Sequence, residues 1–192
     1  DFISRSGQQK FLGPGALAFN EFNLLFNRDQ VNVQGGFLLG EDDTLAGERG
    51  DDRLFGGEDY DVFVWNPEDG SDLIEGGNGV DALTFNGSNV SEIVDLSSQD
   101  ERRRLFRNIG PVFIDAHGLE EVLFNALGGA DTIRVHDLIG THVGAVSLDL
   151  SSEEALGVGD EQPDRVIMEG TTDDDAKWVI GSPAELRVSG LA

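Results

Sequence analysis

The sequence predicts an all-β protein: a parallel β-roll over residues 38–84 that continues into an irregular parallel β-helix, or solenoid, over residues 85–192, with an apolar N-terminal cap over residues 1–37. Three observations support this prediction. Five nine-residue units recur in near-continuous register. Short β-rich runs separated by turn residues fill the second half of the chain, and that half shows no helical periodicity.

The nine-residue units share a glycine-rich start, an aspartate at the sixth position and a large apolar residue at the eighth. Residues 76–84 carry the whole pattern. The units at 38–46, 47–55, 56–64 and 67–75 carry it with substitutions, and a two-residue slip at Trp65 and Asn66 separates the last two. The sixth-position residues are Asp43, Asp52, Asp61, Asp72 and Asp81, and the eighth-position residues are Leu45, Leu54, Phe63, Ile74 and Leu83.

This spacing divides each unit into a tight turn of six residues and a strand of three. Glycine suits the turn because the backbone there needs positive φ and a close approach to an ion. Alternation in the strand points only the eighth residue inward, so stacked strands build a thin apolar core. No single unit buries that side chain alone, and the units are therefore expected to stack, with Asp61 and Asp81 on the same side of the roll.

The turns offer carboxylate and carbonyl oxygens, which are the hard donors that Ca²⁺ prefers. The sequence therefore predicts several bound calcium ions. A later turn, 126–134, regains glycine at the fourth position, aspartate at the sixth and isoleucine at the eighth. A weaker echo at 170–178 has Asp175 at the sixth position. The candidate metal-site residues are Asp43, Gly47, Arg49, Asp51, Asp52, Gly56, Glu58, Asp61, Asp69, Asp72, Gly76, Asn78, Asp81 and Asp131.

Some units depart from the pattern. Glu41 and Asp59 replace the glycine at the fourth position, and Leu38, Leu39 and Pro67 replace the opening glycines. We expect calcium to bind most weakly where these substitutions fall.

The net charge of −24 is concentrated in the repeats. Residues 38–81 hold 14 acidic side chains against Arg49 and Arg53, a net charge of −12. Without cations this segment should repel itself and stay open, so calcium binding should be coupled to folding. The acidity argues against nucleic acid or an anionic membrane as a partner, because both are polyanions. No run of 18 apolar residues predicts a transmembrane segment, and there is no cysteine.

The flanking segments differ from the repeats. Apolar residues crowd residues 11–26, which we interpret as part of the cap, with a short helix near 16–27; a partner-binding or membrane-touching strip is the alternative. A separate β-sandwich is the alternative for residues 85–192. The β-rich runs of that half are 93–96, 112–114, 122–124, 132–135, 146–150, 166–168, 178–180 and 186–188.

Residues 38–84 resemble the RTX, or haemolysin-type, calcium-binding repeat family of exported bacterial proteins. The stretches 63–72 and 124–133 also resemble a sub-group in which a non-canonical β-rich region follows the repeats, and residues 85–192 resemble that region more loosely. The resemblance implies Ca²⁺ binding, export by one-step (type I) secretion and folding outside the cell. It implies a secreted, extracellular or cell-surface module of a larger protein, and no catalytic activity.

An enzymatic function is not indicated by any motif. The chain has no Gly-x-Ser-x-Gly elbow, His-Glu-x-x-His or phosphate loop, and its three histidines are widely spaced. Glu120 and Glu121 are expected to be solvated. The basic cluster at 101–107, which holds Arg102, Arg103, Arg104 and Arg107, is expected to be a solvated strand face or loop, with docking of acidic turns or of an anionic polysaccharide as the alternative. We expect no enzyme but a calcium-binding structural or secretion module; a carbohydrate- or surface-binding, adhesive module of a secreted polysaccharide-active enzyme is the alternative.

Overall fold

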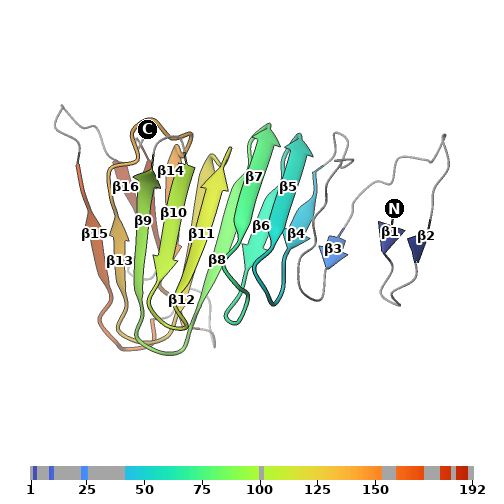
Figure 1. Ribbon diagram of the computed structural model, residues 1–192. Helices are drawn as coiled ribbons and strands as arrows, with labels where there is room; N and C mark the ends of the chain where they lie inside the picture. Colours follow the sequence, from blue (N-terminus) through green and yellow to red (C-terminus); the bar gives the residue numbers. More distant parts are fainter. Residues whose placement is uncertain are drawn as a thin grey trace.

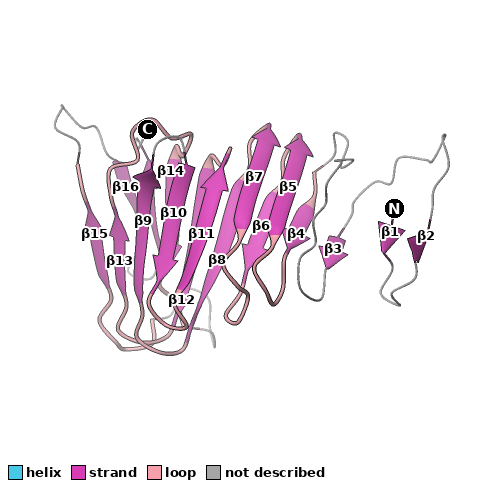
Figure 2. Cartoon of the chain, viewed as in Figure 1, coloured by secondary structure: helices cyan, strands magenta, loops and turns pink. Residues whose placement is uncertain are grey.

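The computed structural model describes residues 2–3, 9–10, 23–25, 42–99, 102–152, 159–170, 178–182 and 185–189. These residues form strands, turns and loops without any helix, so the predicted all-β class is confirmed (Figure 2). In the described part of the chain there is accordingly no helix that could cross a membrane.

Most strands belong to two open sheets (Figure 1). The seven-stranded sheet has the order β15 (Arg165–Met168), β13 (Thr132–Val135), β9 (Ile93–Gln99), β10 (Arg102–Arg107), β11 (Val112–His117), β7 (Leu73–Asn78) and β5 (Arg53–Glu58). The eight-stranded sheet has the order β16 (Trp178–Ser182), β17 (Glu185–Ser189), β14 (Ala145–Asp149), β12 (Glu121–Leu127), β8 (Ala82–Ser88), β6 (Val62–Trp65), β4 (Thr44–Ala46) and β3 (Asn23–Leu25). A separate antiparallel pair joins β1 (Phe2–Ile3) and β2 (Gln9–Lys10).

Successive strands from β4 to β9 alternate between the two sheets. From β4 to β6, each of these strands pairs in parallel with the strand two places further along the chain. Thr44 pairs with Val62, an offset of 18 residues, whereas Arg53 pairs with Leu73 and Val62 with Ala82, offsets of 20. The two-residue slip accounts for the difference, because Trp65 and Asn66 fall within both longer offsets and outside the shorter one.

The eighth-position side chains build the core between the sheets. Leu45, Phe63 and Leu83 stack along the eight-stranded sheet, and Leu54 and Ile74 stack along the other. All five are at most 4% exposed. Full burial of such a side chain contributes about 1.5–3 kcal/mol. The predicted inward position of the eighth residue is confirmed.

Trp65, one of the two slip residues, belongs to β6 and is buried. Its ring stacks on Phe85 with a centroid distance of 4.3 Å and an interplanar angle of 1°. Phe85 in turn stacks on Phe124 at 5.6 Å. The indole Nε1–H donates to the Gly70 carbonyl at 2.9 Å, which ties the longer turn back onto the strand. The slip therefore adds an aromatic row to the core.

Strands β10 and β11 form an inserted hairpin that interrupts the parallel arrangement. They lie between β7 and β9, and β10 pairs antiparallel with both β9 and β11. In the opposite sheet β8 pairs directly with β12, with Ala82 beside Glu121. The second half is thus not a simple parallel continuation. Its other pairs β9–β13, β12–β14 and β13–β15 are parallel, whereas β17 pairs antiparallel with β14 and β16.

All eight β-rich runs that the sequence predicts in the second half lie on strands. Among the described strands of that half, β10 is the one outside these eight predicted runs. In the first half, residues 23–25 form β3 beside β4, so the short helix expected near 16–27 is wrong there. The rest of that helix and the Asp175 turn lie outside the described residues. The domain boundaries at 37 and 84 stay predictions.

Candidate metal centre

The sixth-position carboxylates of the turns before β4, β6 and β8 form one row, which we call ladder 1. Asp43, Asp61 and Asp81 are 7%, 1% and 0% exposed. The backbone N–H of Asp43 donates to Asp61 Oδ1 at 3.0 Å, and that of Asp61 donates to Asp81 Oδ1 at 2.9 Å. Asp61 and Asp81 therefore lie on the same edge, as predicted.

Glu120 is the next member of ladder 1. The Asp81 N–H donates to Glu120 Oε2 at 2.8 Å, and the Glu120 N–H donates to the Asp81 carbonyl at 2.9 Å. The expectation of a solvated Glu120 is therefore wrong. Residues 115–123 place Gly118 at the fourth, Glu120 at the sixth and Val122 at the eighth position. Allowing glutamate at the sixth position would have revealed this unit.

Two further rows lie at the edge where the parallel strands of the seven-stranded sheet begin. Ladder 2 is Asp52 and Asp72, with the Asp52 N–H donating to Asp72 Oδ1 at 2.9 Å. Ladder 3 is Glu92, Asp131 and Asp164. In ladder 3 the Glu92 N–H donates to Asp131 Oδ1 at 2.7 Å, and the Asp131 N–H donates to Asp164 Oδ1 at 3.0 Å.

The sequence reading missed Glu92 and Asp164. Residues 87–95 and 159–167 each keep a glycine at the first position, an acid at the sixth and a valine at the eighth, but lose the other glycines. The acid at six and the apolar residue at eight are therefore more persistent in this chain than the glycines. Strands β10 and β11 separate ladder 2 from ladder 3.

In three aspartates of the ladders, the second carboxylate oxygen has no hydrogen bond to stabilise its negative charge. Oδ2 of Asp61, of Asp81 and of Asp131 is buried without a hydrogen-bond partner. Leaving a buried acceptor unsatisfied costs about 1–3 kcal/mol, and more for a charged group. A cation beside these oxygens would remove that cost.

Five carboxylates of the ladders have a raised pKa. Burial raises the pKa of Asp61, Asp72 and Asp131 to about 7, and neighbouring carboxylates add to the rise. Burial also raises the pKa of Asp81 and of Asp164. These shifts have one physical origin, because carboxylates in low dielectric without a cation favour the neutral form.

The first-position glycines leave room for the carboxylates. A Cβ at Gly56 would lie 2.3 Å from Asp61 Oδ2, and one at Gly76 would lie 2.6 Å from Asp81 Oδ2. At Gly47 the corresponding distance, to Asp52 Oδ2, is 2.9 Å. A side chain at these positions would fill the space that each carboxylate oxygen occupies.

Positions two and four have positive φ in many of the turns. The values span 61° to 142° for Glu48, Gly50, Gly57, Asp59, Glu68, Gly77, Gly79, Gly118, Leu127 and Gly129. The turns also stack closely, since a Cβ at Gly77 would lie 2.1 Å from the Gly57 carbonyl oxygen. Asp59 keeps the left-handed conformation despite its side chain, with φ at 73°. Weaker calcium binding at Glu41, Asp59 and Pro67 stays a prediction.

The remaining candidates do not join the buried carboxylates. Arg49 pairs with Glu68 and both side chains are exposed. Asn78 Nδ2 donates to Glu58 Oε1 at 2.9 Å on the surface. Asp51 Oδ1 accepts the Ser71 N–H at 2.8 Å, and Asp69 Oδ2 accepts the Asn66 N–H at 2.8 Å. These side chains order neighbouring turns.

The ladders place one carboxylate per turn, and no three acidic or histidine side chains converge within the described residues. A metal held here would therefore need backbone carbonyls as its other ligands. The donor set is oxygen throughout, which fits a hard cation such as Ca²⁺ better than a transition metal.

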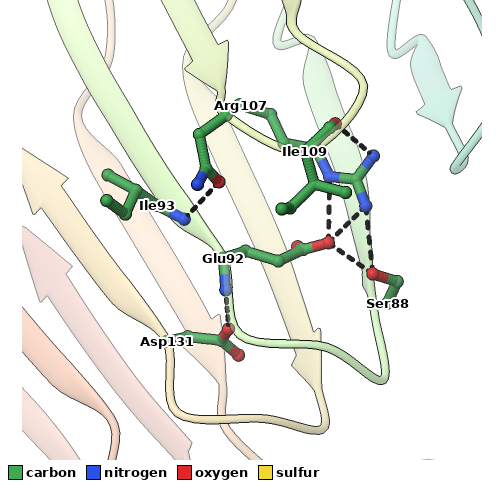
Figure 3. A network of polar contacts seen from close by, with 7 residues as sticks. Ser88, Glu92, Ile93, Arg107, Ile109 and Asp131 are labelled. Carbon is green, nitrogen blue, oxygen red and sulfur yellow. Dashed lines mark hydrogen bonds and ion pairs between the residues drawn. The ribbon is translucent and has the colours of Figure 1, made fainter.

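The basic cluster lies on strand β10, and only one side of that strand is the solvated face that the sequence predicts. Arg102 and Arg104 face outward from β10, whereas Arg103 and the nearby Arg107 are buried at 2% and 4% exposed. Arg107 Nε donates to Glu92 Oε1 at 3.0 Å, its Nη1 donates to the Ile109 carbonyl at 2.9 Å and its Nη2 donates to Ser88 Oγ at 3.0 Å (Figure 3). Arg107 also lies 5.5 Å from the Trp65 ring centroid.

The fold and the site define an all-β protein with rows of buried carboxylates stacked along its sheet edges. Comparisons of the chain with protein-family models, with curated proteins and with solved structures gave no match.

Proposed function

We propose that residues 42–88 form a calcium-binding β-roll of the RTX type, with Ca²⁺ ions bound between stacked turns. The observation that carries the proposal is the pair of buried, unpartnered Oδ2 atoms of Asp61 and Asp81, which occupy successive turns of one ladder. Gly56 and Gly76, which have no side chain, leave space beside the same two oxygens.

The carboxylates of Asp61 and Asp81 would hold calcium along ladder 1, and those of Asp52 and Asp72 along ladder 2. Carbonyls of the glycine-rich turns would supply the other ligands. Bound calcium would compensate the negative charge that these buried acids bring together. Affinity in the range of extracellular modules, about 10⁻⁴–10⁻³ M, is expected.

Such binding couples calcium to folding. A cation that binds only the folded chain stabilises it by mass action. The repeats would then stay open at low calcium in the producing cell and fold after export. In this proposal the chain is a structural and secretion module of a secreted protein, without catalytic activity.

Circular dichroism with calcium and with excess chelator tests the coupling. We expect β-content to fall in chelator and to return in millimolar calcium. β-content that does not change in chelator would contradict the proposal.

Variants test the assignment. Asp61→Asn and Asp81→Asn should each weaken calcium binding along ladder 1 as a whole. Each variant removes a negative charge from a row whose neighbouring turns bind calcium together. Asp95→Asn is the matched control, since Asp95 pairs with Arg134 on the outer face of the seven-stranded sheet. Equal effects from all three variants in a calcium titration would count against the site.

A second candidate function is carbohydrate binding, favoured by an exposed aromatic on the inserted hairpin. Phe113 is 44% exposed, its ring lies 4.9 Å from that of Phe106, and the Arg104 guanidinium lies 5.0 Å from its centroid. Aromatic faces and guanidinium groups suit an acidic polysaccharide. Glycan-array binding that Phe113→Ala abolishes would support this candidate, and no binding by the folded chain would exclude it.

A further inference from the structure

The chain contains two Asn-Gly pairs, Asn78-Gly79 and Asn86-Gly87. This dipeptide is chemically labile, because glycine has no side chain to hinder attack of its backbone nitrogen on the preceding asparagine side chain. Asn78 is the last residue of β7, whereas Asn86 lies inside β8. The same two residues therefore occur in two different environments of one protein.

The first pair lies at an exposed strand end. The pairing of β7 with β5 ends at Asn78, so Gly79 follows the last paired residue. Both residues are exposed, as are their neighbours Gly77 and Val80. The Asn78 side chain makes one surface hydrogen bond, from Nδ2 to Glu58 Oε1 at 2.9 Å. Strand ends open locally at low free energy, so this side chain can turn onto its own main chain while the rest of the protein stays folded.

The second pair is held from both sides. Asn86 Nδ2 donates to Asn66 Oδ1 at 2.9 Å, and Asn86 Oδ1 accepts from Asn125 Nδ2 at 2.7 Å. Strand β8 pairs with β6 on one side and with β12 on the other. Gly87 is buried, and a Cβ there would lie 2.9 Å from the Ala126 carbonyl oxygen. Attack on the Asn86 side chain would require both amide hydrogen bonds to break inside a paired strand.

We propose that Asn78 is a site of spontaneous deamidation and isoaspartate formation in the folded protein, and that Asn86 is protected from this reaction. The Gly79 nitrogen attacks Cγ of Asn78, the Cγ–Nδ2 bond breaks, and ammonia leaves with the proton of the Gly79 N–H. Water then opens the cyclic imide. Opening at Cγ gives aspartate, and opening at the main-chain carbonyl gives isoaspartate, in which the main chain runs through the former side chain.

The product changes the contact between two stacked turns. A carboxylate replaces the amide that donates to Glu58, so a hydrogen bond is lost and two like charges face each other. Isoaspartate also lengthens the main chain directly before Gly79. A Cβ at Gly79 would lie 1.9 Å from the Asp59 carbonyl oxygen, so the two turns leave little room for such a change. Modification at Asn78 should therefore loosen the stacking of turn 76–81 on turn 56–61.

Peptide mapping by mass spectrometry tests the proposal on the full chain, incubated at mildly alkaline pH under conditions in which circular dichroism shows the fold. Deamidation at Asn78 should be at least about tenfold faster than at Asn86, because Asn86 must lose two hydrogen bonds and leave two neighbouring strands. Enzymatic methylation of isoaspartate should label the same peptide. The denatured chain is the matched control, and its two sites should react at similar rates. Asn78→Gln should abolish the reaction at position 78 and leave the Asn86 rate unchanged.

Two results would overturn the proposal. In one, the folded chain deamidates at Asn86 as fast as at Asn78. In the other, the folded chain keeps its amide at Asn78 over a period in which the denatured chain loses both. The comparison depends on the fold and not on the proposed calcium sites, because a chain that folds without calcium gives the same test.

Discussion

Residues 42–88 and residues 89–170 both bury acids at the edges of their sheets, but they differ in where the positive charge comes from. In the first region the two arginines, Arg49 and Arg53, are exposed, and Arg49 pairs with the exposed Glu68. In the second region Arg107 is buried against Glu92. We propose that an external ion neutralises the first region's rows, whereas in the second region Arg107 of the inserted hairpin pairs with Glu92.

The difference has a structural origin. The hairpin β10–β11 separates β7 from β9, so ladder 2 does not continue into ladder 3. At that interruption the Glu92 carboxylate faces β10, whose inward residues include Arg107 beside Val94 and Val112. The turn before β9 therefore has no turn of β7 stacked beside it. Its Glu92 carboxylate pairs instead with Arg107, a side chain of the same protein.

Removal of calcium should have the largest effect and should act unevenly. In excess chelator we expect amide protection of β5 to β8 to be lost, because their turns depend on external charge. Protection of β9 and β10, which Arg107 ties together, should fall less. Hydrogen exchange with mass spectrometry measures this, and equal loss in both regions would break the comparison.

Lowering the pH should stabilise the calcium-free protein, because protonation removes negative charge from the buried carboxylates. The folded-state pKa of Asp61, Asp72 and Asp131 is about 7, above the ordinary value near 4. The folded chain therefore binds more protons than the unfolded chain between roughly pH 4 and 7, and these groups stabilise it as pH falls and destabilise it as pH rises through 7.

Thermal melting of the calcium-free protein measures this effect. The melting temperature should be higher at pH 5.5 than at pH 8, and Asp61→Asn combined with Asp131→Asn should flatten the difference. A melting temperature that rises with pH would contradict the assignment of these shifts to the folded state.

Loss of Arg107 should come next. Arg107→Met leaves the Glu92 carboxylate buried without a cation, which is expected to cost about 3–5 kcal/mol of unfolding free energy. Adding Glu92→Gln should recover most of that loss. Arg104→Met on the outer face is the matched control and should stay within about 0.5 kcal/mol. Denaturant unfolding in saturating calcium measures all three, and equal losses at Arg104 and Arg107 would argue against an internal cation.

The smallest effect concerns turn stacking. Gly77→Ala places a methyl group 2.1 Å from the Gly57 carbonyl oxygen, whereas Gly110→Ala, also at positive φ, meets nothing within 4 Å. Both positions have positive φ, but the 120° of Gly77 is more strained for a side chain than the 52° of Gly110, so their difference reports backbone strain and stacking together. We expect Gly77→Ala to cost about 1–3 kcal/mol more than Gly110→Ala. Similar melting temperatures for the two variants would show that the turns can separate without cost.

Much of the first region could be predicted from local rules. The sixth and eighth positions gave the buried acids and the inward apolar residues, because tight turns and two-residue alternation in strands are short-range properties. Glu92, Glu120 and Asp164 were not predicted as members of the ladders, because the repeat pattern was defined by its glycines together with an aspartate. The structure shows that glutamate serves at the sixth position and that Glu48, Asp59 and Glu68 tolerate positive φ.

The sequence by itself determined the all-β class, most strand positions and the residues that turn inward in the repeats, since each depends on neighbours within one unit. The tertiary structure decided which turns stack and that the Arg107 guanidinium is buried beside Glu92. Ala82 pairs with Glu121 and Glu92 bonds to Asp131, each across 39 residues, while a hairpin enters the opposite sheet. A local pattern does not encode such pairing, because it depends on the combined packing of both sheets.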